Sequence, residues 1–309
     1  MAQALPYTSN GVSSALLGAT LGTLTVLCWA SYNVAAVQGI KAGLQAVDLV
    51  LLRFGVAGLI LAPALSLLRR RDGTAAGWPS IGRAVVLALL GGPIFGMLAV
   101  GGYAFAPLSH GMLFAPAAVF VVGTALAVIV NGERLSGRKV RGGAVVVAGL
   151  VVLSGAVSGG IAPGVWRGDL LFIAAGTMWA GFTVLMRRWS IDPLRGTLRV
   201  GAVSGLFAPI VYGAAILWGT PSGLAITPFS ETLFQAVMQG VVGGVLSIAA
   251  LMGAARLLGA ATAALLPSFT PVVALGLAIP ALGDWPSGQE VIGVAIAVVG
   301  LSIASARRI

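Results

Sequence analysis

Residues 132–150 read GERLSGRKVRGGAVVVAGL, and residues 283–301 read GDWPSGQEVIGVAIAVVGL. With a shift of 151 positions and no gap, nine of the 19 aligned positions are identical. An apolar chain gives many chance matches, but a shared Ser-Gly pair followed by glycines at the same spacing is harder to obtain by chance. The same shift places Pro116 on Pro267. Self-similarity at a fixed distance indicates that the chain contains two copies of one structural unit.

The repeat extends toward the start of each copy. Residues 28–33 (CWASYN) align with residues 178–183 (MWAGFT), and Arg53 aligns with Arg199. The dipeptides Ala62-Pro63 and Ala208-Pro209 align with the same shift as the two arginines. We therefore expect an N-terminal tail and two repeats, with bounds 1–11 for the tail, 12–158 for the first repeat and 168–306 for the second.

The composition of the 309 residues predicts a membrane protein. Residues of the set AVILMFWYC make up 58% of the chain, charged residues make up 8%, and the mean hydropathy is +1.03. Soluble chains carry about 25% charged residues. Too few charges remain here to cover a soluble surface, so a soluble enzyme, a disordered protein and a nucleic-acid binder are all disfavoured.

The apolar runs predict an all-α protein with ten transmembrane helices. A membrane span needs about 20 apolar residues. Ten runs of that kind are separated by charges, glycines and prolines, at residues 12–37, 46–68, 81–103, 107–131, 139–158, 168–187, 198–218, 235–255, 259–281 and 288–306. Because five spans per copy is an odd number, the second copy must be inverted relative to the first. Inverted repeats are an architecture of transporters, whose substrate site lies near the membrane midplane. The alternative is a duplication that only stabilises a helical bundle.

The basic residues predict that both termini are cytoplasmic. With the N-terminus inside, only Lys41, Arg53 and Arg167 of the 18 Lys and Arg residues fall on the outer side. An excess of Lys and Arg on cytoplasmic loops is the rule for membrane proteins, and it accounts for the net charge of +10 without a nucleic-acid partner. Residues 1–11 contain no Lys or Arg, which argues against a cleavable signal peptide. The 15 residues assigned to the cytoplasmic side are Arg69, Arg70, Arg71, Arg83, Arg134, Arg138, Lys139, Arg141, Arg187, Arg188, Arg195, Arg199, Arg256, Arg307 and Arg308.

The sequence offers no enzyme or metal motif. It has one cysteine, Cys28, and one histidine, His110, so neither a Cys- or His-based metal site nor a Ser-His-Asp triad can be assembled within one chain. It has no GxxxxGK[ST] motif for nucleotide phosphates. All eight acidic residues fall at or near the ends of the predicted spans, so no buried carboxylate is evident as a proton carrier. We expect no cofactor and a substrate that is neutral or zwitterionic, not phosphorylated.

The chain resembles the drug/metabolite transporter superfamily in its ten-span EamA-type branch. The residues that carry the resemblance are the two Trp segments, LRF at 52–54, NGERLSG at 131–137 and the weaker GDWPSG at 283–288. The resemblance implies a basket of ten helices around a central cavity lined mainly by spans 1, 3, 4, 6, 8 and 9. Within the branch the chain is most similar to YddG-type exporters of aromatic and other neutral amino acids. That similarity implies export across a bacterial inner membrane.

Aromatic and polar residues near the middle of the first and sixth spans define the candidate cavity. Trp29 and Asn33 are four residues apart and share a helix face, and Trp179 and Thr183 repeat this spacing. Two indoles from opposite repeats would flank an aromatic or aliphatic substrate side chain. The alternative is that the tryptophans form an interfacial belt. The other candidate cavity residues are Tyr32, Tyr103, His110, Met178, Phe182, Gln239 and Ser268.

Two ionisable residues have alternative interpretations. Arg53 lies about two turns into the second span, where it either snorkels to the outer surface or anchors a substrate carboxylate near the outer mouth. His110 lies at the break between the third and fourth spans, where it is either a hydrogen-bonded structural residue or a pH-sensitive gate.

Pro116 and Pro267 lie at equivalent depths of the fourth and ninth spans. A proline removes a helix hydrogen bond and frees a carbonyl, so the pair predicts two hinges that either face substrate or move during transport. The alternative is a simple kink, which membrane helices tolerate.

Together these features predict a secondary transporter, not an enzyme, that exports neutral or aromatic amino acids or similar metabolites by alternating access. The alternatives are a transporter of other metabolites or drugs, an intramembrane enzyme that handles lipid, and a channel. The absence of a coupling acid favours facilitated diffusion over proton antiport. We expect a monomer whose partners are its small-molecule substrate and membrane lipid.

Overall fold

A computed structural model describes residues 10–72, 77–132, 135–155, 163–263 and 265–305. Within these ranges every regular element is a helix, so the predicted all-α fold is confirmed. Most of the expected N-terminal tail, the acidic turn residues Glu133 and Arg134, and the last basic residues Arg307 and Arg308 lie outside the described residues.

The first repeat contains five helical segments, of which the third is interrupted. Gly92, at φ −104° and ψ −141°, ends α3, and Pro93 begins α4. Proline suits a first helical position because the N–H that it lacks has no partner there. The elements are α1 (Asn10–Lys41), α2 (Ala46–Asp72), α3 (Ile81–Gly91), α4 (Pro93–Gly101), the 3-10 turn η1 (Gly102–Ala104), α5 (Leu108–Asn131) and α6 (Gly137–Leu153).

The second repeat also contains five helical segments, of which the third and fourth are interrupted. Eleven residues of the third segment, Ala236–Leu246, form a π-helix. Each of the ten apolar runs thus corresponds to one helical segment. The elements are α7 (Val165–Arg188), α8 (Pro193–Leu217), α9 (Phe229–Gln235), the π-helix η2 (Ala236–Leu246), α10 (Ser247–Leu258), α11 (Ala260–Ala263), the 3-10 turn η3 (Leu266–Phe269), α12 (Thr270–Leu282) and α13 (Gly288–Ser305).

Seven of the described helical segments are long and apolar enough to cross a membrane. The segments Leu266–Leu282 and Gly288–Ala304 are apolar but shorter, and α6 has 17 residues. Ten crossings therefore stay a prediction. The seven are Ser14–Lys41, Ala46–Arg71, Ile81–Ala104, Leu108–Val130, Val165–Arg188, Pro193–Leu217 and Phe229–Leu258.

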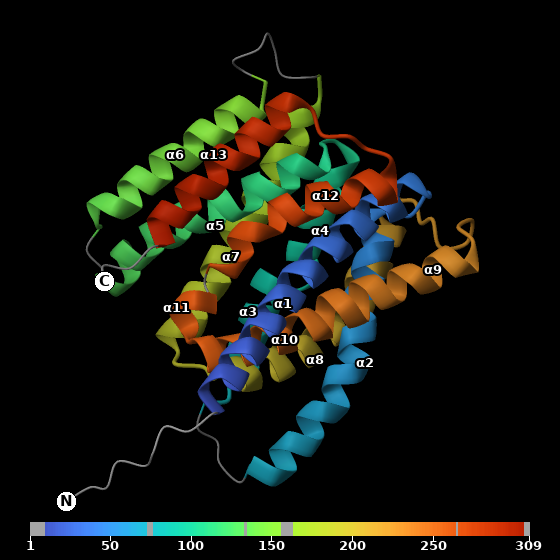
Figure 1. Ribbon diagram of the computed structural model, residues 1–309. Helices are drawn as coiled ribbons and strands as arrows, with labels where there is room; N and C mark the ends of the chain where they lie inside the picture. The colour runs from blue at the N-terminus through green and yellow to red at the C-terminus, as the bar shows by residue number, and fades with distance from the viewer. Residues whose placement is uncertain (1–9, 73–76, 133–134, 156–162, 264, 306–309) are drawn as a thin grey trace, which may run out of the picture.

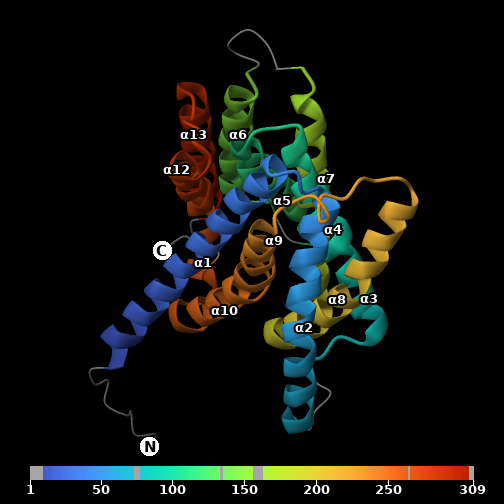
Figure 2. The same ribbon diagram turned by 90° about the vertical axis from the view of Figure 1, so that its right-hand side faces the viewer.

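The last helices of the two repeats, α6 and α13, pack against each other in opposite directions (Figures 1 and 2). Gly142 faces Gly300, and Gly149 faces Gly293. A Cβ atom on Gly142 would lie 2.7 Å from the Gly300 carbonyl oxygen, and one on Gly149 would lie 2.8 Å from that of Gly293. The sequence repeat aligns Gly142 with Gly293 and Gly149 with Gly300, so exchanging the two repeats reproduces the same pair of contacts.

The second helices of the two repeats, α2 and α8, also cross in opposite directions. A Cβ atom on Gly58 would lie 2.5 Å from the Gly205 Cα atom, and Gly201 lies against Leu61. An approach as close as that of Gly58 and Gly205 is possible because both helices present a glycine at that point. Equivalent helices that run antiparallel are what an inverted repeat requires. Other contacts between helices also recur when the two repeats are exchanged. The first helix α1 packs on α10 and α12, and its counterpart α7 packs on their counterparts α4 and α5.

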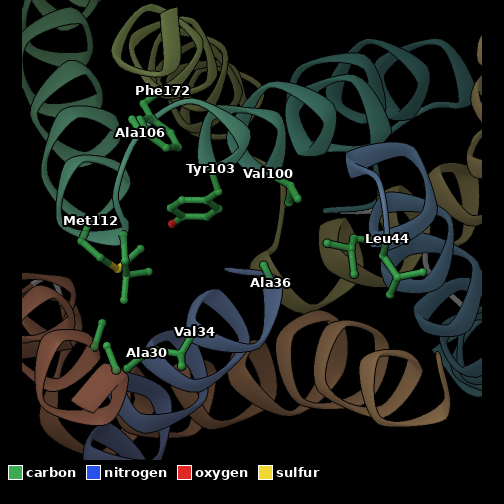
Figure 3. Packing of buried hydrophobic residues seen from close by; sticks show 13 residues of the cluster. Ala30, Val34, Ala36, Leu44, Val100, Tyr103, Ala106, Met112 and Phe172 are labelled. Atoms are coloured by element: carbon green, nitrogen blue, oxygen red, sulfur yellow. The ribbon is translucent and has the colours of Figure 1, made fainter. Parts of the chain in front are cut away.

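The largest buried apolar cluster lies where α1, η1, α5, α7 and α12 meet (Figure 3). Ala30 and Val34 of α1, Met112 of α5 and Phe172 of α7 contribute to it, and Tyr103 of η1 lies among them. The aromatic ring of Tyr103 thus reaches the interior, where both repeats contribute side chains.

Candidate functional site

Tyr103 and Asn33 form a polar contact within this apolar interior. The Tyr103 hydroxyl donates a hydrogen bond to Asn33 Oδ1 at 2.9 Å, and Asn33 Nδ2 donates to the Trp29 carbonyl oxygen at 2.8 Å. The Tyr103 ring packs on Phe172 with centroids 5.0 Å apart. Figure 3 shows the Tyr103 side chain pointing inward among residues of α1, α5 and α7. Three of the predicted cavity residues, Trp29, Asn33 and Tyr103, are therefore linked by hydrogen bonds.

Arg53 lies beside this group. Its guanidinium carbon lies 4.4 Å from the centroid of the Tyr32 ring and 5.6 Å from that of Phe54. Tyr32 in turn packs on Gly243 of η2, since a Cβ atom there would lie 2.9 Å from the Tyr32 ring. The Arg53 side chain, which is half-buried, is thus directed at α1 within the bundle. We call Tyr32, Asn33, Arg53 and Tyr103 the outer polar cluster, after the side of the membrane that the basic residues predict for it.

The predicted residues of the sixth span form a separate, more apolar group. Trp179 stacks on Phe182 at 4.8 Å and contacts Phe95 of α4 at 5.2 Å between centroids. Thr183 Oγ1 donates to the Ala180 carbonyl oxygen of its own helix, and Met178 is half-buried. We call Phe95, Trp179 and Phe182 the inner aromatic cluster, again after the predicted orientation. The two indoles have different neighbours, so their joint contact with one substrate stays a prediction.

His110 makes a buried contact between the first turns of α5 and α7. His110 Nδ1 lies 2.7 Å from Asp169 Oδ1, and their side chains are 7% and 10% exposed. The imidazole also stacks on Phe114 of its own helix. Next to it, the Ser109 hydroxyl donates to Glu290 of α13. These contacts hold the beginnings of three helices together.

Two acidic residues near helix ends are buried, which corrects the sequence-based expectation that end positions leave no buried carboxylate. Asp48 has no exposed surface and Asp169 is 7% exposed. Asp48 accepts hydrogen bonds from the Gln45 backbone N–H at 2.8 Å, the Ser222 hydroxyl at 2.6 Å and the Gly223 backbone N–H at 2.7 Å. The burial of Asp48 could not be predicted from its position in the sequence, because the loop that covers it belongs to the other repeat.

Gln239 lies in the packed interface between η2 and α1. It has no exposed surface, and its Nε2 donates to the Tyr32 carbonyl oxygen at 2.8 Å. Gln235, one α-helical turn earlier, donates to the Ala35 carbonyl oxygen and to Glu231. Sequence reasoning missed Gln235 and Glu231, although the four-residue spacing of the three polar side chains on one helix was available as a signal.

The two predicted hinge prolines lie in different settings. Pro116 lies inside the continuous helix α5, whereas Pro267 lies in the 3-10 turn η3 between α11 and α12. Ser268, next to it, is buried. The prolines thus share a position in the repeat but not a local structure, and their role as hinges stays a prediction.

A surface groove between α6 and α13 lies apart from these clusters and is lined by Arg138, Arg141, Ala144, Val145 and Ile303. Among the described residues, no three His, Cys, Asp or Glu side chains are placed to hold a metal ion.

A family model for the EamA-like transporter family matches the chain twice, over residues 16–155 and 166–306. No curated protein matches the chain. Of 18 solved chains that match, one titled only "Crystal structure of protein" is 22% identical with a TM-score of 0.63, over 94% of this chain and 97% of that one. This likeness shows a shared fold. Because the two family matches together cover most of the sequence, the chain belongs to the EamA-like transporter family and is a multi-pass membrane transporter of small molecules.

Proposed function

We propose that this chain is a secondary transporter that exports neutral or aromatic amino acids, or similar zwitterionic metabolites, across the bacterial inner membrane. The observation that carries the proposal is the packing of two repeats through equivalent, antiparallel helices. Two copies of one unit in opposite orientations can exchange conformations, which opens a midplane site to each side in turn. The proposed unit is a monomer with ten spans and cytoplasmic termini.

Contacts between distant loops support ten crossings. In the proposed topology each of these contacts joins helix ends on the same side of the membrane. Removing one span would place the two partners of several contacts on opposite sides. The outer contacts are Lys41 with Asp284 at 2.8 Å, Asp48 with Ser222, and His110 with Asp169, and the inner contacts are Arg199 with the Pro79 carbonyl oxygen and Arg188 with that of Val130. In Figure 1, α1 begins and α13 ends on the same side of the molecule.

Two clasps between the repeats support alternating access. In the outer clasp, the α8–α9 loop supplies Ser222 and Gly223 to Asp48 of α2. In the inner clasp, the α2–α3 loop supplies the Pro79 carbonyl oxygen to Arg199 of α8, whose guanidinium also lies 5.2 Å from the Trp78 ring centroid. Each repeat thus closes a loop over the second helix of the other. Releasing one clasp while the other holds would open one side only.

The side chains at the two clusters support an amphipathic substrate without a phosphate group. The outer polar cluster offers hydroxyl, amide and guanidinium groups, and the inner aromatic cluster offers ring faces that suit an aromatic or aliphatic side chain. The proposed mode is facilitated diffusion, in which transport is not coupled to an ion gradient. Other metabolites and drugs are the second class of candidate substrates, because the family match identifies a transporter and names no substrate.

Counterflow in proteoliposomes tests the function. Vesicles that contain the purified full chain and an excess of unlabelled phenylalanine are expected to accumulate labelled phenylalanine transiently, with saturation and without a pH gradient. Uphill movement only when a pH gradient is imposed would replace facilitated diffusion by proton coupling. Absence of flux for every neutral amino acid would refute the amino-acid assignment, and non-saturating flux without counterflow would indicate a channel.

Cysteine accessibility tests the topology. The one native cysteine, Cys28, is buried, so a Cys28→Ala background is suitable. Ala225 and Ile81 are both exposed, in the α8–α9 loop and at the start of α3. An impermeant thiol reagent is expected to label Ala225→Cys in intact cells and Ile81→Cys only after permeabilisation. Labelling of both from outside would refute the proposed orientation.

A further inference from the structure

We infer that Arg53 binds the carboxylate of the transported substrate, in a site completed by Tyr32 and Tyr103. The inference rests on the proposed function, because it assigns a chemical group to the substrate of that transporter. It implies that amino acids and other carboxylates of similar size are bound and that amines or amides of the same shape are not.

Arg53 has a positive charge that the described residues leave unpaired. Within the described ranges, ion pairs connect Lys41 to Asp284 and His110 to Asp169, and Arg53 makes neither an ion pair nor a hydrogen bond there. Placing an arginine within a membrane span is costly, and such residues usually pair or line a substrate path. A bound carboxylate would neutralise the charge and accept hydrogen bonds from two of the five N–H donors of the guanidinium.

Two carboxylates of the elements near α1 and α2 are engaged by other groups. Asp48, on the same helix as Arg53, accepts hydrogen bonds from Gln45, Ser222 and Gly223. Glu231 of α9 accepts hydrogen bonds from Gln38 at 3.0 Å and from Gln235 at 2.9 Å. Neither carboxylate can turn to Arg53 without breaking these contacts, so a bound substrate is the better source of a counter-anion.

The geometry of the guanidinium suits a carboxylate. The guanidinium carbon lies over the Tyr32 ring, 4.4 Å from the ring centroid. A stacked guanidinium keeps its N–H edges open, and two parallel N–H donors match the two oxygens of a carboxylate. Tyr32 is itself held against Gly243 of η2, so the stacking surface is packed from behind.

The position of Arg53 directs it inward. Tyr32 belongs to α1, and Phe54, the second ring beside the guanidinium, packs on Gly96 of α4. Tyr32 is followed along α1 by Asn33, whose Oδ1 accepts the hydrogen bond of the Tyr103 hydroxyl. A guanidinium that snorkels to a lipid headgroup would point away from these elements. The carboxylate would therefore bind between α1, α2 and η1, where the Tyr103–Asn33 contact lies.

Competition in wild-type proteoliposomes tests the carboxylate requirement without any substitution. Counterflow of labelled phenylalanine is challenged with phenylalaninamide, which lacks the carboxylate, and with 3-phenylpropanoate, which lacks the ammonium group. Loss of a charge-assisted hydrogen bond typically costs about ten-fold or more in affinity. We expect phenylalaninamide to compete at least about ten-fold more weakly than phenylalanine, while 3-phenylpropanoate still competes. Equal competition by phenylalaninamide would overturn the inference.

Substitution then assigns the requirement to Arg53. Arg53→Gln is expected to abolish the difference between phenylalanine and its amide, and Arg53→Lys, which keeps the charge without the planar fork, is expected to retain part of it. Arg167→Gln is the matched control, because Arg167 is an exposed outer arginine stacked on Trp166. Discrimination that survives in Arg53→Gln would overturn the assignment.

A binding measurement separates this inference from the proposed function. If wild-type vesicles show no amino-acid flux, the proposed function fails, and thermal stabilisation of the purified protein by 3-phenylpropanoate still tests the anchor. Stabilisation that is present in the wild type and Arg167→Gln, reduced in Arg53→Lys and absent in Arg53→Gln supports the anchor. Equal stabilisation of all four proteins, or of none, overturns it.

Discussion

Arg53 and Arg199 occupy equivalent positions of the two repeats, and their surroundings differ. Each lies about two turns into the second helix of its repeat, and each stacks on an aromatic ring. Arg199 is 7% exposed and donates to the Pro79 carbonyl oxygen. Arg53 is half-buried, and its guanidinium lies beside the rings of Tyr32 and Phe54. One arginine closes a contact within the protein, and the other offers its donors to a ligand.

The difference shows that neighbours, and not the position in the repeat, decide what an arginine does. The inner clasp uses the arginine itself, since Arg199 holds the α2–α3 loop. The outer clasp uses Asp48 to hold the α8–α9 loop, which leaves Arg53 outside the contact. Substitutions at the two clasps and at the two clusters measure how far this difference extends.

Arg199→Gln is expected to have the largest effect on stability. It removes a charge-assisted hydrogen bond in a buried setting and the stacking on Trp78, at a cost of about 2–3 kcal/mol in the free energy of unfolding. Arg53→Gln is expected to lower that free energy by less than about 1 kcal/mol, because it removes the contact with the Tyr32 ring but no hydrogen bond within the described residues. Thermal unfolding in detergent measures both. A larger loss of stability in Arg53→Gln than in Arg199→Gln would show that Arg53, and not Arg199, closes the more important contact within the protein.

Asp48→Asn is expected to have the second-largest effect on stability and to lower the free energy of unfolding by about 2 kcal/mol. An amide NH₂ would then face N–H and O–H donors that the carboxylate now satisfies. The change opens the outer clasp and leaves the inner clasp intact. Labelling of an Ala225→Cys reporter should therefore become faster, while labelling of Ile81→Cys should not change. Equal acceleration at both reporters would show that the clasps do not act separately.

His110→Gln tests the contact between the first turns of α5 and α7. The variant removes the imidazole that lies 2.7 Å from Asp169 Oδ1, and it leaves this buried carboxylate without its present partner. We expect the free energy of unfolding to fall by about 1–2 kcal/mol, which thermal unfolding in detergent measures. A variant as stable as the wild type would show that the contact does not hold the two helices together, and an unchanged counterflow rate would remove His110 from the transport mechanism.

The fold was largely predictable because the apolar runs are long and the glycine pattern of residues 142–149 recurs at 293–300. The interruptions within helices were not. The π-helix Ala236–Leu246 carries Gly240, Gly243 and Gly244, which let Val56, Tyr32 and Ala57 approach its backbone. Packing against two other helices sets that backbone conformation, and a single sequence does not reveal which helices those are.

The candidate site was predictable as residue types but not as contacts. The four-residue spacing of Trp29 and Asn33 predicted that the two share a helix face, and Asn33 does bond to the Trp29 carbonyl oxygen. The mid-span charge singled out Arg53 as either a surface group or a substrate group. The hydrogen bond from Tyr103 to Asn33 joins residues 70 positions apart, and the Asp48 contact with Ser222 joins residues 174 positions apart. Such pairings depend on how the two repeats dock, so no local pattern encodes them.

Tyr103→Phe is expected to have the smallest effect on stability. It tests which of the two clusters binds the carboxylate end of the substrate. The variant keeps the ring on Phe172 and removes the hydroxyl that donates to Asn33, so the free energy of unfolding should fall by about 0.5–1 kcal/mol. Asn33 Oδ1 would then lack this donor in the outer polar cluster, beside the proposed carboxylate. We expect the apparent affinity for phenylalanine in counterflow to weaken a few-fold. Thr183→Val makes the matched change in the inner half, because it removes a hydroxyl that bonds only to its own helix, and it should leave that affinity unchanged. If Thr183→Val weakens affinity as much as Tyr103→Phe does, the carboxylate end of the substrate does not lie in the outer polar cluster.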